Sequence, residues 1–145
     1  MRHLATYALI LLNVSLCLAQ QPVKYQKVSI DCLFLGNLRQ KEFVINSDQE
    51  FYQITKLRTS IPGIKCAGLP DIDFKKKTLV GYIVSVGSCP TPTFHMSFTQ
   101  SEFNYLLKVE VQTQGVCRRG YSELYWLVID KVEDPQSIEF ETVFL

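Results

Sequence analysis

The sequence predicts a mainly β protein, α+β by strict count, folded as an antiparallel sandwich or half-open barrel of six to seven strands with one short N-terminal helix. Segments rich in β-branched and aromatic residues recur along the chain, and turn-forming residues separate them at intervals of roughly 8 to 12 residues. A single segment has the apolar spacing of a helix. The composition, 47% hydrophobic and 20% charged, is that of a folded globule and excludes a disordered chain.

The first strands are expected after a short polar segment that precedes residue 27. Residues 27–35 alternate apolar and polar positions, and Gly36 and Asn37 supply a turn before a short strand at residues 42–45. These two segments are predicted to form a hairpin.

A helix of about ten residues is predicted from Asp48 onward. Ser47 and Glu50 have the spacing of a capping box, in which each residue satisfies a free backbone N–H at the helix start. One helical face then carries Phe51, Ile54 and Leu57. Residues 59–70 contain two prolines and two glycines and are expected to form an irregular loop.

The second half of the chain has the pattern of consecutive strands. Residues 79–86 are apolar enough to be buried on both faces, and Gly81 marks a bulge or a close approach of another chain segment. Further strands are expected at 93–99, 105–111, 124–129 and 138–144. The single tryptophan, Trp126, is predicted to lie in the core, packed by Leu124 or Val128 and by Phe140.

Residues 1–19 have the pattern of a secretory signal peptide. Arg2 precedes an apolar stretch at residues 4–18, and the small residues Cys17 and Ala19 occupy the positions that precede cleavage. The stretch is shorter than the roughly 20 apolar residues of a membrane span. No membrane span is therefore expected after cleavage.

Residues 20–145 then form one exported domain, periplasmic or extracellular. The alternative is a lipoprotein with lipid attached to Cys17, although Leu16 places a bulky residue where that signal has a small one. The 15 Lys and Arg residues, less Arg2, leave 14 against 14 Asp and Glu. The chain therefore has no excess of positive charge that would attract nucleic acid. The sequence does not indicate an oligomeric state.

Export to an oxidising compartment predicts that the remaining cysteines form disulfides. These cysteines are Cys32, Cys66, Cys89 and Cys117. Zinc is the alternative, but structural zinc sites use closely spaced ligand pairs and none occurs here. The chain also lacks the glycine-rich, heme and flavin motifs that would indicate a cofactor.

Candidate catalytic residues are few, and we predict that the protein is not an enzyme. His95 is the single histidine after residue 19 and is expected on the polar face of a strand, exposed to solvent. Asp71 and Asp73 could bind calcium or act as an acid–base pair. They precede a strand, however, where aspartate commonly bonds the backbone of its own turn.

Two basic clusters remain as candidate contact sites. Residues 75–77 are three lysines in a predicted turn, where a run of charge is typical of a solvated face. Arg118 and Arg119 directly follow Cys117, so a disulfide there would hold both arginines in place. Arginine is enriched at protein interfaces, and this pair is the better candidate for contact with a partner.

Five segments carry a resemblance to a known family. They are LPDIDFKKKTLVGY at 69–82, GSC at 87–89, GVC at 115–117, YWLVIDK at 125–131 and IEF at 138–140. With them the chain resembles small exported bacterial proteins related to the protease-complex subunit PrcB, and versions from the Bacteroidetes are the most similar. The chain departs from the family pattern at residues 88–92, where relatives often carry a Thr-Gly-Gly-Tyr turn.

The resemblance implies a noncatalytic accessory domain that binds another exported protein and stabilises an envelope or surface protease complex. Because Cys89 and Cys117 recur in the family pattern beside a glycine, it also implies that these two are bridged, which leaves Cys32 and Cys66 for a second pair. Two other functions remain as alternatives: a carrier of a small apolar ligand in the mouth of a β-barrel, and a small hydrolase that uses His95, or Asp71 with Asp73.

Overall fold

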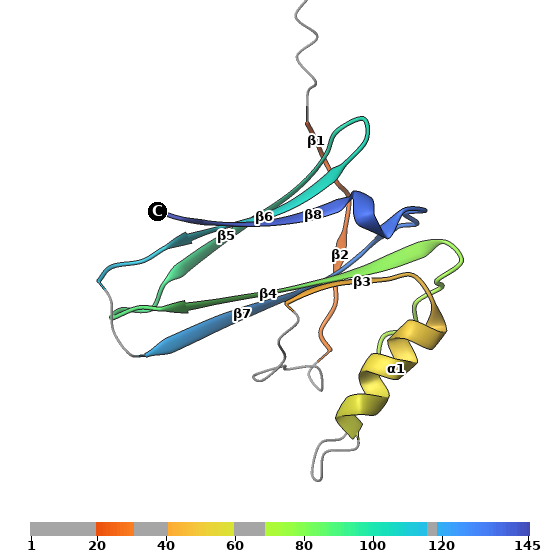
Figure 1. Cartoon of the computed structure of the whole chain (residues 1–145), viewed down its shortest axis with the longest axis horizontal. Coiled ribbons are helices and arrows are strands. Elements are labelled where there is room, and N and C mark those ends of the chain that lie inside the picture. Colours follow the sequence, from red (N-terminus) through yellow and green to blue (C-terminus); the bar gives the residue numbers. More distant parts are fainter. Residues whose placement is uncertain (1–19, 31–40, 60–68, 116–118) are drawn as a thin grey trace, which may run out of the picture.

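A computed structural model of the chain describes residues 20–30, 41–59, 69–115 and 119–145, with the side chains of residues 57–59 left out. The described part contains eight strands in two sheets, one α-helix and a short 3-10 turn (Figure 1). The predicted mainly β sandwich is confirmed, and the sheets do not close into a barrel. The predicted signal peptide, the turn at Gly36 and Asn37, and Cys32, Cys66 and Cys117 lie outside the described residues.

Each sheet has four strands. In order across the sheet, sheet A contains β1 (Gln21–Pro22), β5 (Thr93–Gln100), β6 (Tyr105–Gln112) and β8 (Ile138–Phe144). Sheet B contains β2 (Gln26–Lys27), β7 (Gly120–Asp130), β4 (Lys77–Gly87) and β3 (Glu42–Ile45). The five longer predicted strands and the short strand at 42–45 all appear within a few residues of their expected bounds.

One feature of the topology differs from the predicted antiparallel arrangement. β8 pairs with β6 in parallel, because the chain leaves sheet A after β6, crosses sheet B as β7 and returns in the direction of β6. In the described part of the chain β3 pairs with β4, and the turn and most of the strand of the predicted hairpin lie in residues 31–40, outside the described residues.

The two shortest strands belong to one segment that connects the sheets. β1 pairs with the end of β5, and β2 pairs with β7. Val23 donates its N–H to Phe98 of sheet A, and Val28 donates its N–H to Trp126 of sheet B, at 2.9 and 3.0 Å. Residues 21–28 therefore close one side of the sandwich.

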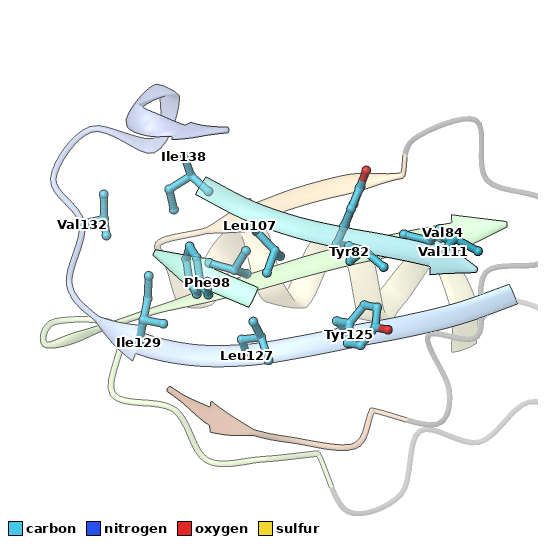
Figure 2. Packing of buried hydrophobic residues seen from close by; sticks show 12 residues of the cluster. Tyr82, Val84, Phe98, Leu107, Val111, Tyr125, Leu127, Ile129, Val132 and Ile138 are labelled. Carbon is cyan, nitrogen blue, oxygen red and sulfur yellow. The ribbon is translucent and has the colours of Figure 1, made fainter. Parts of the chain in front are cut away.

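The core between the sheets is built from alternate residues of the long strands (Figure 2). Because successive strand residues point to opposite faces, each strand gives one row to this core. Sheet B contributes Val80, Tyr82, Val84, Tyr125, Leu127 and Ile129, and sheet A contributes Phe98, Leu107, Val109, Val111 and Ile138. The hydroxyl groups of Tyr82 and Thr142, 2.6 Å apart, link β4 to β8 across it.

The opposite face of sheet B holds a second apolar cluster, covered by α1 (Asp48–Thr59) (Figure 1). Its buried members are Ile30, Phe43, Ile45, Ile72, Phe74, Leu79 and Trp126. The helix adds Phe51 and Ile54, and the Phe51 and Phe74 ring centroids lie 5.7 Å apart. Sheet B is thus buried on both faces.

Trp126 belongs to this second cluster and is 3% exposed. Leu124 and Val128 pack against the same cluster as predicted. The predicted contact with Phe140 is wrong, because Phe140 lies on sheet A and packs on Tyr82 in the core between the sheets. The indole instead reaches across Gly81, its register partner on β4, toward Phe43, with ring centroids 5.6 Å apart.

The start of the helix follows the predicted capping box in part: Ser47 makes the expected bond, and the Glu50 side chain bonds one residue earlier than Ser47. Ser47 Oγ accepts the N–H of Glu50 at 3.2 Å, and the Glu50 carboxylate accepts the N–H of Asn46 at 2.7 Å. The acidic Asp48 and Glu50 lie in the first turn, where negative charge is favourable. The helix begins at the predicted residue for these reasons.

A network of hydrogen bonds lies beside sheet B, near the start of helix α1. Asn46 Oδ1 accepts a hydrogen bond from the buried hydroxyl of Thr78, and Asn46 Nδ2 donates to the Val132 carbonyl at 3.0 Å. Val132 N–H donates to the same Thr78 oxygen at 3.0 Å. The Lys131 ammonium donates to the carbonyls of Asn46 and Phe74, at 2.8 and 2.9 Å. These bonds join β3, β4 and the chain after β7.

Candidate functional site

The connections from β4 to β5 and from β6 to β7 meet at one end of the sandwich, which we call the loop end (Figure 1). The strand register explains why they meet. Gly87 at the end of β4 pairs with Gly120 at the start of β7, and Thr93 at the start of β5 pairs with Gln112 at the end of β6. The described part of the loop end comprises residues 88–92, 113–115 and 119.

The first connection is anchored directly to the second. Ser88 donates its N–H to the carbonyl of Arg119 at 3.1 Å. Cys89 is disulfide-bonded in this structure, and a Cβ atom added to Gly115 would lie 3.2 Å from its sulfur. Gly115 has a φ of +70°, a left-handed conformation that favours glycine. The pairing with Cys117 stays a prediction.

Arg119 is the described member of the predicted contact pair, and Arg118 lies outside the described residues. The guanidinium carbon of Arg119 lies 5.2 Å from the centroid of the Tyr121 ring, a distance at which a cation is attracted to an aromatic face. The Arg119 side chain is exposed. It therefore presents its charge to solvent from a position that the ring helps to fix.

A shallow hollow of about 180 Å³ lies beside these loops. It is lined by Pro90, Thr91, Thr93, Gln112 and Gln114. The hydroxyl and amide groups of this lining can both donate and accept hydrogen bonds, and none is charged. Sequence reasoning missed this hollow, because its lining residues come from two connections that are far apart in the chain.

A second hollow, of about 210 Å³, lies where residues 22–24 pass between the sheets, and Gln100, Tyr105 and Asp130 are among its lining residues. The carrier alternative requires an apolar mouth between the sheets. Among the described residues between the sheets, Leu107, Val109 and Leu127 are fully buried, and the carrier stays an alternative.

His95 lies exposed on the outer face of sheet A, as predicted. Its register partner on β6 is Glu110. The hydrogen bond and charge of Lys108, 2.8 Å away, lower the pKa of the Glu110 carboxyl, and the charge of His95 adds a smaller effect. The neighbours of this histidine are therefore charged surface residues, and in the described part of the chain no serine or cysteine is hydrogen-bonded to it.

The predicted turn role of Asp73 is confirmed. Its Oδ1 accepts the N–H of Lys75 at 3.1 Å, and its carbonyl accepts the N–H groups of Lys76 and Lys77, both at 2.9 Å. Asp71 is exposed. Among the described residues, no group of three or more His, Cys, Asp or Glu side chains could hold a metal ion.

The described architecture defines a class of protein: a two-sheet β-sandwich with a helix packed on the outside of one sheet. In comparisons with protein-family models, curated proteins and solved structures, nothing matches this chain. No helix in the described ranges is long and apolar enough to cross a membrane.

Proposed function

We propose that the protein is an exported, noncatalytic accessory module that binds another exported protein through its loop end. The observation that carries this proposal is the placement of Arg119, which rests on Tyr121 and whose backbone is hydrogen-bonded to Ser88. Arginine and tyrosine are the residues that most often dominate the binding energy of interfaces.

The rest of the loop end supports a binding role. Because Cys89 is bridged and Ser88 is bonded to the neighbouring loop, the loops lose little conformational freedom when a partner binds, and this favours affinity. The neutral hollow next to them offers hydroxyl and amide groups. These groups suit the exposed backbone and polar side chains of another protein.

The resemblance to PrcB-related proteins suggests the kind of partner. A component of an envelope or surface protease complex fits it, and the module would stabilise that complex without taking part in its chemistry. The exposed position of His95 and the turn bonds of Asp73 agree with a noncatalytic role.

The test is a quantitative capture of the partner by tagged protein from the cell envelope, followed by an affinity measurement with the purified partner. Arg119→Ala is compared with Lys76→Ala, an exposed cation at the opposite end of β4, about 33 Å away along the strand. We expect Arg119→Ala to weaken binding about tenfold or more, and Lys76→Ala to leave it unchanged. Equal affinities for the two variants would contradict the proposal.

The proposal that the protein is noncatalytic has its own test. The purified mature protein is assayed for hydrolysis of peptide, ester and glycan substrates, beside the His95→Ala variant. We expect no turnover by either protein and partner affinities within about threefold of each other. Turnover that disappears in His95→Ala would favour the hydrolase alternative.

A further inference from the structure

β8 is the longest of the strands that form the sheet edges in the described part of the chain. It has seven residues, whereas the edge strands β1 and β2 have two each and β3 has four. An edge strand carries unpaired backbone N–H and C=O groups, and proteins commonly protect such edges with Pro, Lys or a bulge. β1 ends in Pro22, but the sequence of β8, IEFETVF, contains neither Pro nor Lys.

The register identifies which backbone groups face outward. Leu145 donates its N–H to Val111 of β6 at 3.0 Å. Because backbone groups of successive residues point to alternate sides of a strand, Glu141 and Val143 bond to β6 like Leu145. The N–H and C=O groups of Phe140, Thr142 and Phe144 then point to the free edge.

The two faces of this edge differ in chemistry. On the core side, Phe140 packs on Tyr82 with ring centroids 5.1 Å apart, and Phe144 is 60% exposed. On the outer side, Glu139 and Glu141 are exposed. An added strand would therefore meet aromatic side chains on one face and carboxylates on the other.

The charge balance around the edge is negative. Glu133 and Asp134 are exposed just before β8 and add to the carboxylates on its outer face. On the neighbouring β6, the cation Lys108 is the register partner of Glu141 and forms an ion pair with Glu110 at 2.8 Å, so one cation faces several carboxylates. Basic side chains on an incoming strand would complement this surface.

We propose that the β8 edge binds an extended, basic segment of a partner protein, in which lysine or arginine alternates with apolar residues. The segment adds to sheet A as a fifth strand, next to β8. Backbone hydrogen bonds provide affinity, and the alternation of charged and apolar side chains provides specificity. β8 belongs to sheet A, and Arg119 precedes β7 of sheet B, although the C-terminal end of β8 reaches the loop end beside Val111. The inference uses the backbone of β8 and not Arg119, so it stands without the proposed function of the loop end.

The probe is a fluorescent peptide of about eight residues that alternates lysine with valine, and the control peptide alternates glutamate with valine. Binding to the purified protein with intact disulfides is measured by fluorescence anisotropy. We expect the lysine peptide to bind about tenfold more tightly or better, and its affinity to fall with added salt. Equal affinity of the two peptides would overturn the assignment of a basic partner.

A matched pair of variants isolates the backbone contribution. Phe144→Ala and Phe144→Pro both remove the aromatic side chain, but only proline also removes the N–H that faces the free edge. We expect Phe144→Pro to bind the lysine peptide about tenfold more weakly than Phe144→Ala, the equivalent of one hydrogen bond. Equal binding by the two variants would overturn strand addition at this edge.

Amide hydrogen exchange of the unmodified protein gives a second readout that needs no variant. The lysine peptide should slow exchange at Phe140 and Thr142 and leave Glu141, already bonded to β6, unchanged. Unchanged exchange at Phe140 and Thr142 with bound peptide would overturn the proposal. Arg119→Ala should bind the peptide normally, which distinguishes failure at the β8 edge from failure at the loop end.

Discussion

Replacing Gly81 by alanine tests how closely Trp126 packs on β4. A Cβ atom at position 81 would lie 2.2 Å from Cζ3, 2.6 Å from Cη2 and 2.7 Å from Cε3 of the indole. Favourable contact between carbon atoms begins at about 3.5 Å. The indole is 3% exposed and lies against the Phe43 ring, so it has little room to withdraw.

The expected cost comes from this overlap. Inserting a methyl group into a well-packed core typically costs about 1–3 kcal/mol. Glycine loses more conformational freedom on folding than alanine does, so the substitution also stabilises the folded state by about 0.5–1 kcal/mol. Because three ring atoms are overlapped, we expect the upper end of the range. After the gain from replacing glycine is subtracted, Gly81→Ala should lower the free energy of unfolding by about 2 kcal/mol and the melting temperature by roughly 8 °C.

Two controls decide whether the indole is the cause. Gly120→Ala, on β7, places a Cβ with no atom within 4 Å, so urea denaturation should show a change of less than about 0.5 kcal/mol. In a Trp126→Leu background, Gly81→Ala should cost less than about 1 kcal/mol, since its clash has been removed. Equal costs for the two alanines, or an undiminished cost in the Trp126→Leu background, would refute the packing argument.

Three further predictions concern pH, buried polar groups and the disulfide. Burial raises the pKa of Tyr125 to about 12. The folded state therefore keeps its full stability below about pH 10, the pKa of tyrosine in an unfolded chain, and loses stability as the pH rises toward 12. Tyr125→Phe cannot ionise and should resist alkaline denaturation better than the wild type in urea titrations. Asn46→Ala leaves the buried Thr78 hydroxyl and Val132 carbonyl without this partner and should lower the free energy of unfolding by about 2–3 kcal/mol. Asn104→Ala removes only an exposed side-chain hydrogen bond and should lower it by less than about 1 kcal/mol in the same assay. Nonreducing peptide mapping should find Cys89 joined to Cys117, a bridge worth roughly 3–4 kcal/mol, and a different pairing or free thiols would contradict it.

Most of the fold could be predicted because the long strands carry strong local patterns. β1 and β2 could not, since two residues show no periodicity. The error over Phe140 has a different cause. Because successive strand residues point to opposite faces, the sequence correctly places Trp126 and its neighbour Leu127 on opposite faces of β7. Both faces of sheet B are buried, however. The pattern therefore does not tell which layer each residue enters.

The surfaces were predictable only in part. Arg119 could be singled out because it follows Cys117 in the chain, a local relationship. The hollow at the loop end joins Thr91 to Gln112 and Gln114 from another connection, and such residues resemble ordinary solvent-exposed positions when taken singly. The β8 edge depends on the order of strands across sheet A, which the sequence of a strand does not contain.

The position of the single tryptophan has a consequence for spectroscopy. Trp126 lies in the layer beneath the helix, whereas Tyr82 and Tyr125 lie between the two sheets. Intrinsic fluorescence excited at the red edge of the absorption band will therefore follow the helix-covered layer, while tyrosine signals will include the sandwich interior. Unfolding curves from the two chromophores will coincide if both layers melt as one cooperative unit, and will separate if the helix detaches first.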